Sequence, residues 1–186
     1  MNDFAYSDIY FGGNKPPSLL SSDKSLSHSI ELYSLTKGFS MAGWRVGFAV
    51  GNKDAISSVT KLKSYIDYGT FQPIQIASTV ALNELEEYPF ELSSVYKERR
   101  ELIVENLEDL NFSVQESTAT MFVWAKLPEK FRNDSLKFSL ELLEKSNVAI
   151  SPGVGFGKYG EGYIRIALVE NKQRIRQAMK NIKAAL

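Results

Sequence analysis

The chain has 186 residues, of which 44% are hydrophobic and 24% charged, as is ordinary for a globular protein. Lysine plus arginine and aspartate plus glutamate are equal at 22 each, so no net charge attracts nucleic acid or an anionic membrane. The sequence has no membrane-spanning apolar run, no signal-peptide pattern, and no cysteine for disulfides or thiolate metal sites. The single histidine, His28, cannot form a metal cluster alone. We therefore expect a cytoplasmic protein that acts on a small molecule.

The first half of the chain predicts short strands followed by helices. Apolar runs bounded by Gly, Pro and Ser favour strands, and apolar residues at helical spacing from residue 53 onward favour helices. Asp54 stands where the first of these helices needs a capping side chain. We predict the end of a strand within residues 2–11, a loop or short helix at 18–29, strands at 30–34 and 44–50, and helices at 54–66, 73–86 and 90–110.

The last third of the chain mixes short strands with helices. This rhythm predicts a separate α+β unit, with a boundary inside the long helix near residue 100. Trp124, on an apolar strand, is predicted to lie in the core. The predicted strands are 112–115, 121–126, 148–151 and 163–169, and the predicted helices are 135–145 and 171–185.

The most informative segment is residues 34–47, SLTKGFSMAGWRVG. It places Lys37 in a short polar stretch between two apolar strands, with hydroxyl groups nearby and Arg45 eight residues later. A lysine that attacks carbonyl groups is activated by partial burial and neighbouring positive charge. An arginine and hydroxyl groups together suit a phosphate dianion. From the residues alone, the segment indicates either a reactive lysine beside a phosphate site or a surface lysine in a turn.

This segment resembles the lysine motif of class I and II pyridoxal-phosphate aminotransferases, in which a small residue precedes the lysine and Arg-x-Gly follows it. The resemblance implies that Lys37 binds pyridoxal phosphate covalently and that Ser34 and Arg45 hold its phosphate. The variant Met41-Ala42-Gly43-Trp44 looks most like the branch that contains alanine and LL-diaminopimelate aminotransferases.

A second motif, Asp3-Phe4-Ala5-Tyr6, is similar to the D-x-A-Y motif of the same family. A cofactor pyridine nitrogen must stay protonated to withdraw electrons, and a buried carboxylate beside it secures that state. The resemblance gives this role to Asp3. It gives Tyr6 a hydrogen bond to the phenolic oxygen of the cofactor.

A third motif, Tyr163-Ile164-Arg165-Ile166-Ala167-Leu168, places one arginine among apolar residues on a strand. Such an arginine is costly unless its guanidinium meets an anion. The resemblance implies that Arg165 binds the substrate α-carboxylate. A buried salt bridge within the small domain is the alternative explanation.

Two other motifs are weaker. Ser34-x-x-Lys37 also matches the nucleophile pair of serine β-lactamases, but Ser-Asp-Asn is missing and Asp3 and Arg45 stay unexplained. The glycines in Pro152–Gly157 suggest a dinucleotide loop, yet a strand pattern follows instead of a helix. In aminotransferases the equivalent P-G-x-x-F-G segment shapes the substrate side of the site.

The resemblance implies an α/β fold: residues 1–100 as the C-terminal part of the large fold-type I domain, and residues 101–186 as the α+β small domain. Family members are longer, so we expect a C-terminal portion that is inactive alone and lacks a helix N-terminus for the phosphate. The expected reaction transfers an amino group between an amino acid and a 2-oxo acid. The alternatives are a β-lyase or decarboxylase on the same fold, or a non-catalytic remnant or regulatory module. Expected partners are a second copy or a missing N-terminal half.

Overall fold

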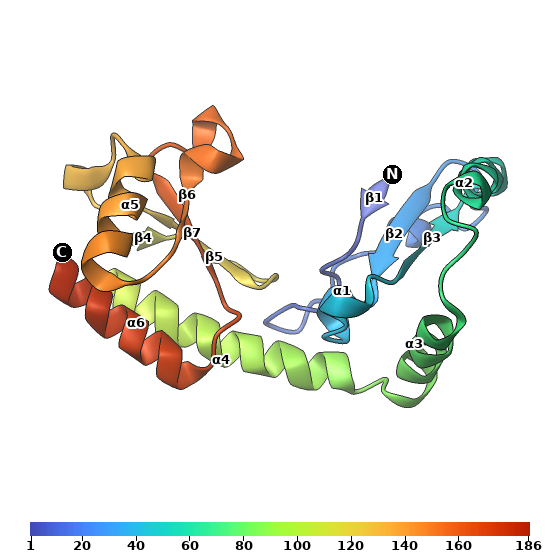
Figure 1. The fold of residues 1–186 in the computed structure, drawn as a ribbon, viewed down its shortest axis with the longest axis horizontal. Helices are drawn as coiled ribbons and strands as arrows, with labels where there is room; N and C mark the ends of the chain where they lie inside the picture. Colours follow the sequence, from blue (N-terminus) through green and yellow to red (C-terminus); the bar gives the residue numbers. More distant parts are fainter. The chain divides into compact units, whose positions relative to one another are not determined.

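The polypeptide divides within its longest helix, α4 (Tyr88–Asp109), into two units (Figure 1). The computed structural model describes residues 1–186; unit 1 is Met1–Ser93 and unit 2 is Ser94–Leu186. The sequence predicted a boundary in this same helix, near residue 100. No helix of the chain has both the length and the apolar character that crossing a membrane requires.

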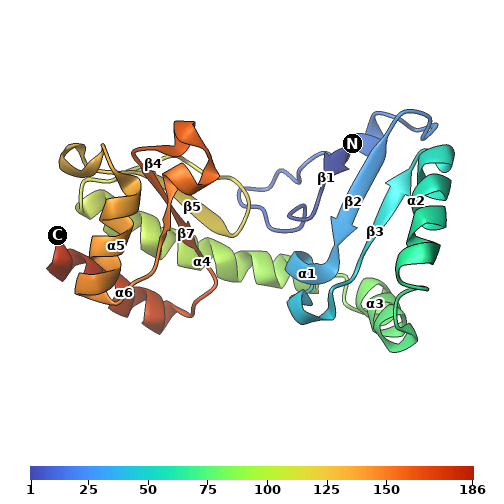
Figure 2. The same ribbon diagram turned by 45° about the horizontal axis from the view of Figure 1, so that its top comes forward.

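Unit 1 is built on a three-stranded sheet with the order β1-β2-β3. β1 (Asn2–Asp3) runs parallel to β2 (Ile30–Ser34), and β3 (Gly47–Gly51) runs antiparallel to β2. Between β2 and β3 the chain forms α1 (Leu35–Gly38) and a short 3-10 helix, η2 (Ala42–Trp44), so α1 lies at the C-terminal end of β2 (Figure 2). The segment that carries Lys37 therefore lies at one end of the sheet.

Glu31, on β2, anchors the long connection between β1 and β2 to the sheet. Its buried carboxylate accepts hydrogen bonds from Asn2 Nδ2 at 2.9 Å, from the Ser18 hydroxyl at 2.8 Å and from the backbone N–H of Leu19 at 2.8 Å. Burial works to raise the pKa of this carboxyl, but the three hydrogen bonds outweigh it and hold the pKa below its usual value. Ser18 caps and Leu19 begins a 3-10 turn, η1 (Leu19–Ser21), which is thereby fixed to the sheet.

Three helices complete unit 1: α2 (Lys53–Ile66), α3 (Gln72–Glu84) and the first turns of α4. No residue of α2 is buried, whereas α3 buries Ser78 and Ala81. The core cluster around the Lys37 segment consists of three buried residues, with four partly buried hydrophobic residues packed against them. They are Leu35, Met41 and Ala81, with Tyr33, Phe39, Val46 and Ala77.

Unit 2 contains an antiparallel four-stranded sheet in the order β4-β5-β7-β6, with α5 and α6 side by side (Figure 1). Residues Val123, Ala125 and Ile164 share one face of the sheet and are buried, together with Ile175 and other residues of the helices. The alternating residues of β5 and β7 point to the opposite face. The elements are β4 (Ser113–Val114), β5 (Phe122–Lys126), η3 (Glu129–Phe131), α5 (Ser135–Ser146), β6 (Ser151–Pro152), η4 (Gly153–Phe156), η5 (Lys158–Gly160), β7 (Tyr163–Ala167) and α6 (Lys172–Ala185).

Two predicted strands begin three residues later than predicted. The strand predicted from residue 44 begins at Gly47, because η2 precedes it and Arg45 adopts a left-handed conformation with φ 51° and ψ 49°. The strand predicted at 148–151 is reduced to Ser151–Pro152, after Asn147 has ended α5 in the left-handed region with φ 55°. In both places a left-handed residue redirects the chain, and periodicity carries no signal for that.

Two predicted side-chain roles were also wrong. The cap of α2 is Asn52, whose side chain accepts the N–H of Ala55 at 2.9 Å, and Asp54 lies in the first turn instead. Trp124 is only partly buried, because it shares the sheet face of Arg165 and not that of Val123 and Ala125.

Candidate active site

Lys37 lies on α1, a single turn whose start is capped by Ser34. The Ser34 hydroxyl accepts the N–H of Thr36 at 3.2 Å and donates to the carbonyl of Val46 at 3.4 Å. The N–H of Leu35 donates to the same carbonyl at 3.3 Å. Ser34 and Leu35 thus bind the lysine turn to Val46, the residue that follows Arg45.

The residues on either side of Lys37 anchor the turn. Leu35 is fully buried in the core cluster, and its carbonyl accepts the N–H groups of Phe39 at 3.2 Å and Met41 at 3.3 Å. Gly38 is buried against Asp8, and a Cβ at this position would lie 2.5 Å from Asp8 Oδ2. Lys37 itself is half-buried between these anchors, so its position is set by its neighbours.

Tyr6 is the aromatic neighbour of Lys37. The Lys37 Nζ lies over the Tyr6 ring, 5.5 Å from its centroid, which is a favourable distance for a cation and an aromatic face. Tyr6 sits in a turn after β1 in which its carbonyl accepts the N–H of the fully buried Ile9 at 3.1 Å. The structure therefore brings together Tyr6 and Lys37, which lie 31 positions apart in the sequence, a proximity that sequence spacing alone could not establish.

Asp3 and Arg45 are less enclosed. Asp3 pairs with Leu32 in the parallel register of β1 and β2, is exposed, and accepts a hydrogen bond from the N–H of Ala5 at 3.3 Å. The Arg45 side chain is exposed and donates to the carbonyl of Ala42 at 3.4 Å. The buried carboxylate expected from the sequence is not formed by Asp3 within unit 1.

The pair Asp8 and Tyr33 was missed by the sequence analysis. The Tyr33 hydroxyl donates to Asp8 Oδ2 at 2.5 Å, and burial, then this hydrogen bond and the aspartate charge, raise the pKa of Tyr33 well above its usual range. Since Asp8 also packs on Gly38, the pair stabilises the turn that carries Lys37. The only signal in the sequence was the position of Asp8 two residues after the D-x-A-Y motif.

Arg165 lies on β7 of unit 2, directly across from Trp124 on β5 and Ser151 on β6. Its guanidinium carbon lies 4.2 Å from the ring centroid of Phe122 and 4.1 Å from that of Phe156. It makes no ion pair with a carboxylate, so the alternative of a buried salt bridge is wrong. A hollow of about 490 Å³ adjoins it, lined by Phe122, Trp124, Arg165 and residues 115–120.

The chain matches the family model described as aminotransferase class I and II over residues 1–182. It belongs to this aminotransferase family. It is 48% identical to an LL-diaminopimelate aminotransferase of Natranaerobius thermophilus, over 97% of this chain and 46% of that protein. It is 43% identical to the glutamate-pyruvate aminotransferase AlaC of Escherichia coli, over 99% of this chain and 45% of that protein.

A solved aminotransferase structure from Staphylococcus aureus agrees with this assignment. It superimposes with a TM-score of 0.89 at 35% identity, covering 98% of this chain and 48% of the other. The resemblance to the alanine and LL-diaminopimelate branch and the α/β fold-type I architecture are thereby confirmed. The chain spans about half the length of the curated relatives that it matches.

The family chemistry can be compared with the residues present. The aminotransferase family generally uses pyridoxal phosphate, and unit 1 offers an amine, a phenol, a hydroxyl and a guanidinium as its possible ligands: Lys37, Tyr6, Ser34 and Arg45. Their chemistry fits a phosphate-bearing aldehyde, because the amine can attack the carbonyl and the hydroxyl and guanidinium can bind the phosphate. The exposed Asp3 fits less well, since a carboxylate holds a pyridinium proton best when it is buried.

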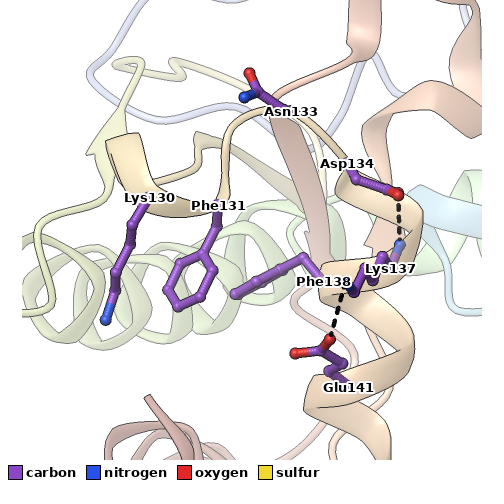
Figure 3. A pocket seen from close by; sticks show the side chains of 7 residues that line it. All are labelled: Lys130, Phe131, Asn133, Asp134, Lys137, Phe138 and Glu141. Carbon is purple, nitrogen blue, oxygen red and sulfur yellow. Dashed lines mark hydrogen bonds and ion pairs between the residues drawn. The ribbon is translucent and has the colours of Figure 1, made fainter.

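A further hollow of about 310 Å³ lies at the N-terminal end of α5 and contains none of these residues (Figure 3). The Asp134 carboxylate accepts the backbone N–H of Lys137 at 2.8 Å, and the Lys137 ammonium lies 3.9 Å from the Glu141 carboxylate. These contacts cap and stabilise α5, so the hollow is part of the structure of the helix start.

Proposed function

We propose that the protein to which this chain belongs transfers amino groups between an amino acid and a 2-oxo acid with pyridoxal phosphate. The observation that carries the proposal is the position of Lys37, half-buried on a turn capped by Ser34 and facing the ring of Tyr6. The family match over residues 1–182 supports it. Because the chain spans about half the length of its relatives, the activity is proposed for the complete assembly.

In this proposal Lys37 holds the cofactor and then moves a proton. Pyridoxal phosphate, when bound, supplies an electron-withdrawing ring that stabilises negative charge on the substrate Cα. The free amine of Lys37 would accept the proton from the substrate Cα as a general base and would later donate it as a general acid. Leu35 and Gly38, which are both buried, keep this amine in place because they fix the turn on either side of it.

The other residues bind and orient. Ser34 and Arg45 bind the phosphate, and Tyr6 donates a hydrogen bond to the phenolic oxygen of the cofactor. Asp3 binds the pyridine nitrogen, for which a further part of the protein must cover its carboxylate. Arg165 binds the α-carboxylate of the amino acid, and its freedom from any acidic partner supports this role.

Reductive trapping tests the lysine. The chain is incubated with pyridoxal phosphate, reduced with borohydride and mapped by mass spectrometry of its peptides. We expect weak labelling of the chain alone, and strong labelling at Lys37 when the N-terminal half of a relative such as AlaC is supplied. Lys37→Arg should abolish that label, and the matched control Lys53→Arg should keep it. Stoichiometric labelling of the chain alone would show that it binds the cofactor unaided, and labelling at other lysines would contradict the proposal.

Product analysis separates the amino transfer from its alternatives. A β-lyase or decarboxylase on the same fold releases its product without a 2-oxo acid acceptor, whereas an aminotransferase requires one. We expect the complemented chain to form an oxo acid only when an acceptor is present. A non-catalytic remnant or regulatory module would form none in either case.

We also propose that unit 1 associates, either with a second copy or with an N-terminal half. Apolar side chains are exposed on its strands and helices, among them Phe48, Leu62, Ile66, Phe71 and Ile76. β1 and β3 each pair with β2 alone, so both edges of the sheet are open to another strand. Light scattering should report a species larger than the 20.9 kDa chain, and a monodisperse monomer would contradict the association. The cytoplasmic location remains a prediction, to be tested by cell fractionation.

A further inference from the structure

The surroundings of Arg165 consist of aromatic rings where an acid would be expected. The rings of Phe122 and Phe156 each lie about 4 Å from its guanidinium carbon, at 4.2 Å and 4.1 Å. Phe122 comes from β5 on one flank of β7, and Phe156 comes from η4, which follows β6 on the other flank. Two rings that approach from opposite flanks hold the guanidinium through cation–π attraction.

This arrangement leaves the hydrogen-bonding edge of the guanidinium unused. No side-chain hydrogen bond and no ion pair of Arg165 occurs in the structure, and its N–H groups are not buried. The rings of Phe122 and Phe156 carry no oxygen or nitrogen atom that could accept hydrogen bonds from its in-plane N–H groups. A carboxylate can therefore approach in that plane and accept two parallel hydrogen bonds.

Phe156 is held in place by the backbone of its loop. The turns η4 and η5 pack against each other through Gly153 and Gly160, where an added Cβ would lie 2.0 Å from the carbonyl oxygen of the other glycine. The Ser135 hydroxyl accepts the N–H of Val154 at 3.3 Å, which ties η4 to the start of α5. Although the Phe156 side chain is 50% exposed, its backbone is fixed by these contacts.

The ring of Phe156 is also supported from the side. It meets Trp124 edge to face at a centroid distance of 5.7 Å, and Trp124 stacks on Tyr163 at 5.5 Å. Trp124 and Tyr163 share the sheet face of Arg165. An aromatic layer on that face thus supports one wall of the clamp, which explains why Trp124 is not part of the core.

We propose that Phe122 and Phe156 form an aromatic clamp that orients Arg165 for the carboxylate of the amino-acid substrate, with Phe156 as a positioning residue. This inference rests on the proposed role of Arg165 in substrate binding. The clamp orders a long side chain before the substrate arrives, so the entropy of ordering it does not weaken binding. It also keeps the guanidinium free of a protein acid that would compete with the substrate.

Nuclear magnetic resonance of the full chain, labelled with ¹⁵N-arginine, tests the clamp with propionate as the carboxylate probe. Arg165→Lys identifies the Arg165 Nε–Hε signal. We expect this signal to be displaced by the ring currents of the two phenylalanines and to move further when propionate is added. Phe156→Leu should return it toward the position of free arginine and weaken propionate binding about fivefold, through loss of the cation–π contact.

Two control variants keep the test specific. Phe156→Tyr retains the aromatic face and should keep both the signal position and the affinity. Tyr159→Leu removes an aromatic ring that is 87% exposed in the same loop and should change neither. If Phe156→Leu leaves both readouts unchanged while propionate still binds at Arg165, the clamp is wrong and the role of Arg165 stands. If propionate does not perturb Arg165 in the unmodified chain, the role of Arg165 fails and the clamp with it.

Discussion

Arg165 and Lys37 are held in different ways by the units that carry them. Arg165 stands on a central strand of a four-stranded sheet and is contacted by rings from its own unit. Lys37 stands on a single turn at the end of a three-stranded sheet, and the nearby Asp3 and Arg45 are exposed. Unit 2 thus organises its residue within its own fold, whereas unit 1 fixes the lysine turn and leaves the surrounding groups open.

The two units show two ways in which a fold can fix the position of a functional side chain. In unit 2 a packed core of helices and strands sets the position of the functional side chain. In unit 1 a few local contacts, the Ser34 cap, the buried Leu35 and the close approach of Gly38 to Asp8, set the position of the lysine. A substitution can disrupt either set of contacts alone, and a matched change elsewhere should have little effect.

The largest effect is expected from the core of unit 2. Leu168 is fully buried, so Leu168→Ala removes apolar contacts and leaves a cavity, at a cost of about 3 kcal/mol in the free energy of unfolding. The control is Leu140→Ala on α5, where the residue is 53% exposed and the change should stay within about 0.5 kcal/mol. Urea unfolding followed by circular dichroism measures both. Equal losses in the two variants would mean that Leu140 is covered in solution.

The next largest loss of stability is expected from the close contact between Gly38 and Asp8 in the lysine turn. Gly38→Ala places a Cβ 2.5 Å from Asp8 Oδ2, so the turn or Asp8 must shift, at a cost of about 2 kcal/mol. Gly43→Ala is the control, because nothing lies within 4 Å of its added Cβ. Unfolding free energies measure the cost. Cofactor trapping in the complemented chain should fall with the first variant alone; the same trapping in both would show that the turn tolerates the shift.

Much of the fold could be predicted from the sequence, because periodic segments carry their own signal. The strand at Ile30–Ser34 has the predicted limits and α2 ends at Ile66 as predicted. The helices near Ser135 and Asn171 begin within a residue of their predicted starts. Where a single left-handed residue redirects the chain, as at Arg45 and Asn147, periodicity has no information and the limits were wrong. Those conformations depend on packing and on capping contacts that no local pattern records.

The candidate site was predicted where a motif existed and missed where only contacts define it. The motifs indicated Asp3, Tyr6, Ser34, Lys37, Arg45 and Arg165. The hydrogen bond between Asp8 and Tyr33 joins residues 25 positions apart, and no motif predicts it. The rings around Arg165 were missed for a similar reason, because Phe156 reaches Arg165 only through the packing of η4 and η5.

Glu31 makes the stability of unit 1 depend on pH. Its pKa is lowered in the folded state, so the unfolded chain takes up the proton first as the pH falls. The stabilisation is complete above the unfolded pKa of about 4.3 and is lost as the pH falls through the folded value. Glu31→Gln puts a donor where the carboxylate accepted hydrogen bonds, and should cost about 1.5 kcal/mol near neutral pH.

Urea unfolding at a series of pH values measures this contribution. The difference between the unmodified chain and Glu31→Gln should be largest near neutral pH and should shrink below about pH 4. Glu116→Gln, at an exposed position of unit 2, is the control and should leave the profile unchanged. A difference that stayed constant with pH would mean that the charge of Glu31 is not what stabilises β1.

The smallest effects on stability are expected from the two asparagine side chains that cap helices, Asn171 at α6 of unit 2 and Asn52 at α2 of unit 1. Asn171 accepts the N–H of Arg174 at 3.0 Å and starts α6, which buries Ile175, Met179 and Ile182. Asn171→Ala should therefore lower the free energy of unfolding by about 1 kcal/mol, because fraying of α6 exposes core residues.

Asn52 accepts the N–H of Ala55 at 2.9 Å and starts α2, which buries no residue. The loss of this cap should appear as faster amide hydrogen exchange in the first turn of α2, with a smaller change in global stability, since an unpacked helix can fray alone. Hydrogen exchange and urea unfolding of both variants separate the two responses. Equal global losses would mean that α2 is packed in solution as firmly as α6, and the contrast between the two units would be wrong.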